Sequence, residues 1–173
     1  MVNGKKKGSR GELEVAKLFK DYGYEDARRS QQYCGVAGDA DVIGVPNLHI
    51  EVKRRQGSEM RKFIAQAESD CAEGSLPVVC YRDDRKPWVA VMKWEAFEKI
   101  YRTSKLMIRI EAKACKNNLF YKWLFDAVRH SPFIDSAVAN SQESGKYVFM
   151  YLENFIEMYK RSEFGGNNEQ RKG

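Results

Sequence analysis

Histidine and closely spaced cysteine are scarce in this sequence of 173 residues. The only histidines are His49 and His130, and no two cysteines form a C-x-x-C pair. The four cysteines lie far apart, at Cys34, Cys71, Cys80 and Cys115. Structural zinc sites need such residues at short spacings, so we do not expect one here. Reduced thiols in a cytoplasmic protein are the simpler expectation.

Long apolar runs are also missing. The basic residues Lys5, Lys6 and Lys7 precede no apolar segment, so we expect no signal peptide. No other run is long enough to span a bilayer. Basic residues are in excess, with a net charge of +6 and a pI near 9.1. This excess favours a polyanionic partner. The first 62 residues carry 13 Lys and Arg against 9 Asp and Glu, and so hold most of this excess.

One stretch combines a hairpin pattern with charged residues. Residues 38 to 55 read GDADVIGVPNLHIEVKRR, which predicts two strands joined by a turn at Pro46 and Asn47. Side chains alternate between the faces of a strand, so His49, Glu51 and Lys53 share one face of the second strand. The short turn brings the start of the first strand back beside the end of the second. We therefore expect Asp41 to lie near Glu51 and Lys53.

Two carboxylates and an amine at one place suit the cleavage of a phosphate ester. Mg²⁺ is held by one or two carboxylates together with water and phosphate oxygens. Lys53 could orient or help deprotonate the attacking water, or offset charge on the phosphate. The alternative is an ordinary exposed strand face, on which opposite charges often alternate.

The first predicted helix carries an acidic residue on its apolar side. The helix begins at Ser9, and Val15, Ala16 and Phe19 recur at helical spacing before Gly23 ends it. Glu12 lies one turn before Val15, on the inward face. Ser9-x-x-Glu12 is also a capping box, which gives Glu12 a purely structural role as an alternative. Residues 1 to 8 are expected to be a flexible basic tail or an arm on a DNA backbone.

The pattern of Asp41 and Glu51-Val52-Lys53 resembles the PD-(D/E)xK nuclease signature. Together with the upstream residues 8 to 12, GSRGE, it is similar to the archaeal-type Holliday junction resolvases and their phage relatives. The resemblance implies that Glu12, Asp41 and Glu51 hold one or two Mg²⁺ or Mn²⁺ ions, and that these three residues and Lys53 are catalytic. Ala40 replaces the usual proline, and Asp39 could compete with Asp41 for the metal.

The resemblance also implies a DNA-binding set and a polar neighbour of the site. An Arg and a Ser at the end of the strand predicted from Tyr24 to Ser30 would contribute to the site or contact the substrate backbone; an exposed basic strand end is the alternative. Gln66, on a helix predicted from Glu59 to Glu73, could bind a metal-bound water or be an ordinary boundary residue. The candidate DNA-binding residues are Lys5, Lys6, Lys7, Arg10, Arg28, Arg29, Ser30 and Arg54.

The order of elements predicts an α/β fold. Two further strands, at residues 76–81 and 88–92, and a helix at 93–102 complete the restriction-endonuclease-like arrangement, a central mixed sheet flanked by helices. The rest reads as an α+β extension with strands at 106–112 and 146–150 and helices at 118–130 and 152–160. We predict a nuclease core at 1–102, an accessory extension at 103–163 and a disordered tail at 164–173.

The expected function is therefore a metal-dependent structure-selective DNA endonuclease, with a Holliday junction as the leading substrate by resemblance. Junction cutting needs paired incisions, so a homodimer is expected. The location would be the cytoplasm, that of the host cell if the gene is phage-borne. Restriction, repair or nicking nucleases of the same fold remain alternatives, and so does a non-catalytic DNA-binding module.

Overall fold

The computed structural model describes residues 4–30, 40–54, 59–107, 109–113, 136–142 and 145–166. The chain divides into two compact units, Met1–Met92 and Lys93–Gly173. Among the described helices, none is long and apolar enough to cross a membrane. The predicted boundaries at residues 102 and 163 stay predictions, and residues 167–173 of the predicted tail lie outside the described ranges.

The first unit is built on a mixed sheet with the strand order β1-β2-β3-β4-β5. The pair β3 and β4 is parallel, while β1 with β2, β2 with β3, and β4 with β5 are antiparallel. The prediction of an α/β fold with a mixed sheet is confirmed. In chain order the elements are α1 (Gly4–Asp21), β1 (Arg28–Arg29), β2 (Val42–Ile43), β3 (Leu48–Arg54), α2 (Met60–Asp70), β4 (Leu76–Arg82) and β5 (Val89–Lys93).

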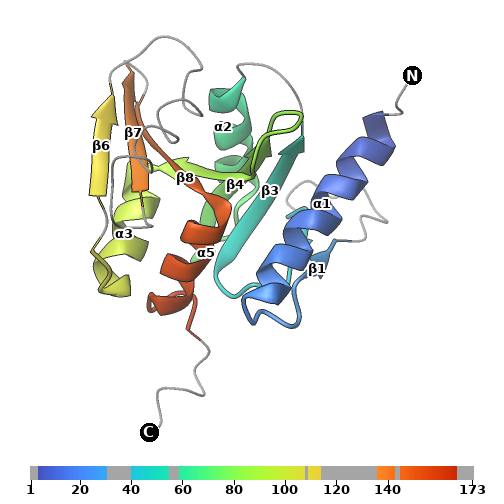
Figure 1. Cartoon of the computed structure of the whole chain (residues 1–173), viewed down its shortest axis with the longest axis horizontal. Helices are drawn as coiled ribbons and strands as arrows, with labels where there is room; N and C mark the ends of the chain where they lie inside the picture. The colour runs from blue at the N-terminus through green and yellow to red at the C-terminus, as the bar shows by residue number, and fades with distance from the viewer. Residues whose placement is uncertain are drawn as a thin grey trace, which may run out of the picture. The chain divides into compact units, whose positions relative to one another are not determined.

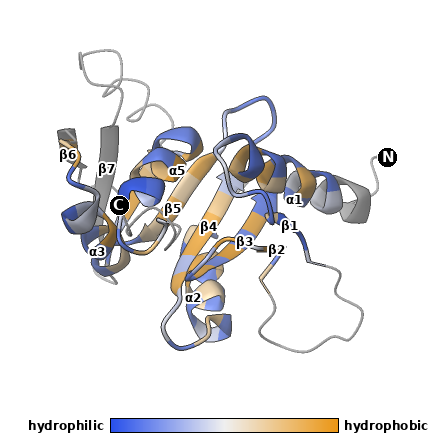
Figure 2. Ribbon diagram, turned by 90° about the horizontal axis from the view of Figure 1, so that it is seen from below, coloured by the Kyte–Doolittle hydropathy of each residue, from blue (hydrophilic) through white to orange (hydrophobic). Residues whose placement is uncertain are grey.

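Helix α2 makes the crossover between the parallel strands β3 and β4, which no short turn could join. Its apolar stripe is buried, at Met60, Phe63, Ile64 and Ala67. Figure 2 shows α1 and α2 on opposite sides of β3 and β4. Most residues of these two strands are therefore buried, as expected for strands covered on both faces.

Helix α1 begins earlier than the sequence predicts. It starts at Gly4, so Ser9 lies inside the helix and cannot cap it. The capping-box role for Glu12 is therefore wrong, and so is the prediction of a flexible tail for residues 4–8. Val15, Ala16 and Phe19 are buried as expected, and α1 lies beside β3 and β1 (Figure 1).

The predicted strand from Tyr24 to Ser30 is shorter in the structure, because its first half folds back on α1. The Tyr24 N–H donates to the Phe19 carbonyl at 3.1 Å, and the Ala27 N–H donates to the Tyr24 carbonyl at 2.9 Å. The Tyr24 ring also packs edge-on against Phe19, with centroids 5.8 Å apart. Only Arg28 and Arg29 remain extended as β1, which adds the first strand to the sheet order.

Gly44 allows the chain before β1 to pass close to the turn between β2 and β3. Its φ of +87° lies in the region that favours glycine, and a Cβ atom there would be 2.0 Å from the Asp26 carbonyl oxygen. A side chain at this position would therefore push β1 away from β2.

Substituting Gly44 tests how closely β1 depends on this approach. Gly44→Ala is expected to lower the free energy of unfolding by about 3 kcal/mol, from positive-φ strain plus the clash. Gly74→Ala is the matched control, because Gly74 has φ +85° but no atom lies within 4 Å of the place that a Cβ would take; it should cost only about 1 kcal/mol. Urea unfolding measures both, and equal losses would contradict the close approach.

The described residues of the second unit form a second group of strands and two helices. Strand β7 pairs in parallel with β6 and antiparallel with β8. Strand β8 and helix α5 match the predicted elements at 146–150 and 152–160, whereas β7 was not predicted and the predicted helix at 118–130 lies outside the described residues. The elements are α3 (Trp94–Ser104), β6 (Arg109–Lys113), β7 (Ser136–Gln142), β8 (Gly145–Tyr151) and α5 (Leu152–Arg161).

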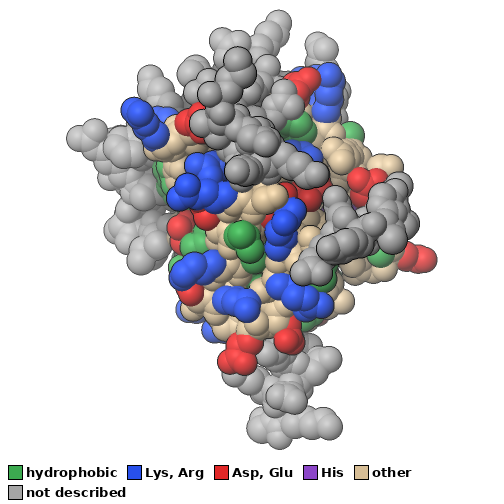
Figure 3. Space-filling model, turned by 90° about the vertical axis from the view of Figure 1, so that its right-hand side faces the viewer, with side chains coloured by type: hydrophobic (Ala, Val, Ile, Leu, Met, Phe, Trp, Pro, Cys, Tyr) green, Lys and Arg blue, Asp and Glu red, His purple; other side chains and the backbone are tan. Residues whose placement is uncertain are grey.

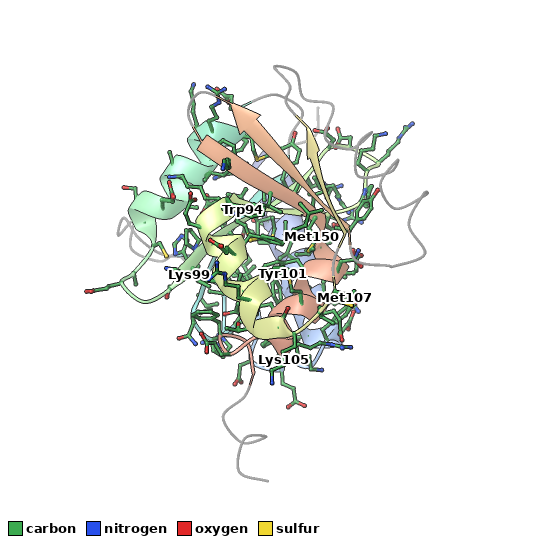
Figure 4. All side chains as sticks on the ribbon, turned by 90° about the vertical axis from the view of Figure 1, so that its left-hand side faces the viewer. Trp94, Lys99, Tyr101, Lys105, Met107 and Met150 are labelled. Carbon is green, nitrogen blue, oxygen red and sulfur yellow. The ribbon has the colours of Figure 1, made fainter. Side chains whose placement is uncertain are left out.

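Helices α3 and α5 repeat one packing solution. Each follows a strand directly and carries a fully buried phenylalanine stacked on a tyrosine four residues later. The ring centroids lie 5.6 Å apart for Phe97 and Tyr101 and 5.7 Å apart for Phe155 and Tyr159. The two helices contact each other within this unit. Figure 4 shows Trp94, Lys99 and Tyr101 along α3.

Candidate active site

The register of the hairpin places Asp41 beside the end of β3. Val42 pairs with Ile50, and Asp41 directly precedes Val42, so Asp41 lies beside the segment of β3 that contains Glu51. The Asp41 N–H donates to the Ile50 carbonyl at 2.8 Å. Its carboxylate oxygen Oδ2 accepts the Val52 N–H, also at 2.8 Å. Asp41 is thus held from both its backbone and its side chain against the Glu51-Val52-Lys53 segment.

The surroundings of Asp41 disfavour its charged form. Burial raises the pKa of Asp41 from 3.8 to about 6, and the negative charge of Glu51 adds to this rise. The Val52 N–H opposes it by stabilising the carboxylate, and Glu12 and Lys53 act in opposite directions. Two more carboxylates therefore lie within electrostatic reach of Asp41, one from α1 and one from β3.

Glu51 and Lys53 form an ion pair on one face of β3. The Lys53 Nζ atom donates to Oε1 of Glu51, and the Glu51 residue is only 5% exposed. The same Nζ lies 5.6 Å from the centroid of the Phe63 ring on α2. The amine is therefore positioned from two sides, and it forms an ion pair with the buried Glu51 carboxylate.

Glu12 reaches this region from α1 but is paired with a basic residue of β1. Arg29 Nε donates to Oε2 of Glu12. Glu12 is half-buried, while Arg29 is more exposed. Glu12 still acts electrostatically on Asp41. To bind a cation held by Asp41 and Glu51 as well, the Glu12 carboxylate would have to be shared between that cation and Arg29.

Asp41 and Glu51 supply a donor set that fits a hard divalent cation. Within the part of the chain that the structure describes, no three His, Cys, Asp or Glu side chains are grouped closely enough to hold a metal by themselves. Mg²⁺ needs only one or two carboxylates, because it keeps several waters and binds phosphate oxygens. A cation would also relieve the repulsion that raises the pKa of Asp41.

His49 lies on the same face of β3 as Glu51 and Lys53, and the sequence predicted no role for it. It is only 5% exposed, and its Nε2 atom has no hydrogen-bond partner among the described residues. Burial lowers its pKa, against the opposing charges of Glu51 and Asp70. The signal in the sequence was its position two residues before Glu51 on the same strand.

The other predicted residues lie at different distances from this cluster. The Ser30 N–H donates to the Asp41 carbonyl at 2.9 Å, whereas Arg28 is exposed. Arg10 is exposed on α1, and Gln66 is exposed on α2. Lys5, Lys6 and Lys7 lie in the first turns of α1, and Asp39 lies outside the described residues.

Arg54 belongs to an ion-pair cluster that the sequence did not suggest. Its guanidinium lies 3.4 Å from a Glu14 carboxylate oxygen, and Arg82 lies 2.6 Å from the other. The Arg82 guanidinium also stacks over the Trp88 ring at 4.6 Å. Gly11 leaves room for this contact, since a Cβ atom there would meet Trp88 at 3.3 Å. We call these residues the Glu14 cluster; it ties α1 to the adjacent ends of β3 and β4.

Comparison with known families agrees with this geometry. The mixed sheet with its flanking helices is consistent with the restriction-endonuclease-like fold of the PD-(D/E)xK nucleases. The model of the family described as "Phage putative PDDEXK endonuclease" matches residues 3–164, and the chain belongs to this family. Membership of the PD-(D/E)xK superfamily is thus confirmed, while the Holliday junction resolvase subtype stays a prediction. No curated protein and no solved structure matches the chain.

Family membership also sets the general chemistry. A PD-(D/E)xK endonuclease family indicates a nuclease hydrolase whose substrate is DNA. Nucleases of this superfamily generally use divalent metal ions. The roles of the individual residues stay predictions.

The titration of Asp41 tests the carboxylate pair. In metal-free protein its carboxyl ¹³C resonance should titrate near pH 6. Glu51→Gln should lower this midpoint, because it removes a nearby negative charge. Because the pKa of Asp41 is higher in the folded protein than in the unfolded chain, this group contributes stability at low pH. That contribution is lost as the pH rises through about 6. Wild type should therefore gain stability relative to Asp41→Asn between pH 7 and pH 5. A midpoint near pH 4 would contradict the pair.

The Glu14 cluster predicts a stability effect remote from the carboxylates. Glu14→Gln keeps the shape of the side chain but leaves two largely buried arginines without their counter-charge. We expect a loss of about 2 kcal/mol in urea unfolding. Asp21→Asn is the control, because it removes the exposed pair with Lys17 and should cost less than about 0.5 kcal/mol. Similar losses from both variants would show that the cluster contributes no more than a surface pair.

Proposed function

We propose that this protein is a Mg²⁺- or Mn²⁺-dependent, structure-selective DNA endonuclease, with the Holliday junction as its leading substrate. One observation carries the proposal: the Asp41 carboxylate is bonded to the Val52 N–H, within electrostatic reach of the buried Glu51, which is itself paired with Lys53. Membership of a PD-(D/E)xK endonuclease family supports the same chemistry. The reaction is hydrolysis of a phosphodiester bond by water.

In this proposal Asp41 and Glu51 hold the divalent ion or ions, and Glu12 joins them if its pair with Arg29 opens. A bound divalent ion would neutralise charge on the phosphate and lower the pKa of a bound water. Lys53 either breaks its ion pair with Glu51 or keeps it while also contacting the substrate. Its Nζ then orients the attacking water or offsets negative charge on the phosphate. The Val52 N–H keeps the Asp41 carboxylate in place throughout.

Exposed basic residues would bind the DNA backbone. Arg10 and Arg28 are exposed, and they lie on α1 and β1, the elements that carry Glu12 and its partner Arg29. Figure 3, in which the right-hand side of Figure 1 faces the viewer, shows several Lys and Arg side chains on this surface. Such contacts position a duplex without reading its bases, which suits selection by DNA shape. A homodimer would give the paired incisions that a four-way junction requires.

Cleavage of matched substrates tests the proposal. A four-way junction, a flap and a linear duplex of the same arm sequence are incubated with wild type in Mg²⁺, Mn²⁺ or EDTA. We expect paired nicks in the junction with either metal, little cutting of the linear duplex, and none in EDTA. Asp41→Asn, Glu51→Gln and Lys53→Ala should each lower the rate at least about a hundredfold, because each removes a metal ligand or the proton-handling amine. Binding in Ca²⁺ should change little.

Glu98→Gln is the matched control, since Glu98 is an exposed partner of Arg102 on α3 and should leave cleavage unchanged. Equal cutting of all three DNAs would contradict selectivity for the junction and would favour a restriction, repair or nicking nuclease. Tight binding without cutting in either metal, unaffected by Asp41→Asn, would overturn the nuclease function in favour of a DNA-binding module.

A further inference from the structure

A hollow of about 660 Å³ lies between α1 and the first two strands. Its lining residues are Leu13, Arg28, Arg29, Ser30 and Ile43. Arg28 and Ile43 are directly opposite each other in the ladder, so their side chains share one face. The size falls within the range of ordinary ligand pockets. Contacts to phosphates alone would use the arginines and leave the apolar walls without a role.

The exposure of Leu13 is the second observation. Its exposed fraction is 57%, and only Met107 is also a large exposed hydrophobic residue in the described part of the chain. Leu13 directly follows Glu12 on α1. Water contact at an isolated leucine is common, but this leucine lines a pocket that two arginine residues also line. A ligand that covered it would gain apolar burial.

The walls of the hollow match the two surfaces of a nucleobase. Leu13 and Ile43 offer apolar contact to the flat face of a base. Arg28 shares the face of Ile43 and offers a planar cation that can stack on a base and donate hydrogen bonds to its edge, while Arg29 is paired with Glu12. A paired base keeps its faces stacked and its edge occupied within the duplex. Only an unpaired base could therefore enter.

Hydrogen bonds connect residues that line the hollow to residues of the candidate metal site. Arg29 donates to Glu12, and the Ser30 N–H donates to the Asp41 carbonyl at 2.9 Å. Among the described residues that line the hollow, Arg29 and Ser30 are thus bonded to residues of the candidate metal site. A base bound here would belong to a nucleotide close to the phosphate at Asp41 and Glu51.

We propose that this hollow binds an unpaired nucleobase of the DNA strand that is cut, close to the scissile phosphate. The inference rests on the proposed nuclease function and narrows its substrate class. It favours DNA in which a nucleotide at a branch point is unpaired, or leaves its base pair when the protein binds, over continuous duplex, in which the bases stay paired and stacked. The energetic source of the selection is burial of the base against Leu13 and Ile43 and stacking on Arg28.

Removing single bases from the DNA tests this inference without relying on cleavage. A splayed-arm DNA is prepared with a normal base or an abasic nucleotide at each of the first unpaired positions, and dissociation constants are measured in Ca²⁺. For wild type, an abasic nucleotide at one position should weaken binding about five- to tenfold. For Leu13→Ser the same lesion should have little effect, because the wall that binds the base has been removed. Linear duplex should bind both proteins equally.

Two further variants serve as controls. Leu13→Met keeps an apolar wall and should retain the sensitivity to the abasic nucleotide. Met107→Ser changes the other exposed hydrophobic residue and should also behave as wild type. Leu13 is exposed, so its substitution should leave the thermal midpoint unchanged.

The outcomes separate this inference from the proposed function. If no abasic position matters, or if Leu13→Ser weakens duplex and splayed-arm DNA alike, the hollow is not a base site, while junction cleavage by wild type would keep the nuclease function. If one position matters and depends on Leu13, yet no DNA is cut in Mg²⁺ or Mn²⁺, base binding stands and the nuclease function falls.

Discussion

The hydrogen bond from the Val52 N–H to the Asp41 carboxylate is the interaction on which the candidate site depends. It fixes the start of β2 against β3 and keeps Asp41 within electrostatic reach of Glu51. Two carboxylates on neighbouring strands repel each other, and burial strengthens the repulsion. Burial first, and the charge of Glu51 second, raise the pKa of Asp41 to about 6. Positive charge is therefore stabilising here, and Lys53 supplies part of it.

The rest of the first unit holds this pair in place. The parallel β3 and β4, joined through α2, make a rigid centre that carries Glu51 and Lys53. The Glu14 cluster fastens α1 across the ends of both strands, and so places Glu12 near Asp41. At the other side of α1, the pair between Glu12 and Arg29 connects the carboxylates to the hollow beside Leu13.

Local patterns predicted the hairpin and its face of charged residues, because strand alternation and a short turn determine which residues meet. They also predicted α2 and β4 to within a few residues. Glu12 was placed on the inward face correctly, but the capping box was wrong because α1 begins at Gly4. The Glu14 cluster joins residues as far apart in the sequence as Gly11 and Trp88, and no local pattern contains it. Strand β7 is rich in Ala, Ser and Asn, and Val138 is its single β-branched residue, so it carries little of the β-branched and aromatic composition that marks a strand.

A crystal of the protein soaked in Mn²⁺ would test the central claim most directly. The anomalous signal locates the ion without reference to any assay. The account predicts a peak within about 2.4 Å of carboxylate oxygens of both Asp41 and Glu51, absent from crystals of Asp41→Asn. A Mn²⁺ ion bound elsewhere, with Asp41 and Glu51 empty in well-ordered density, would contradict it.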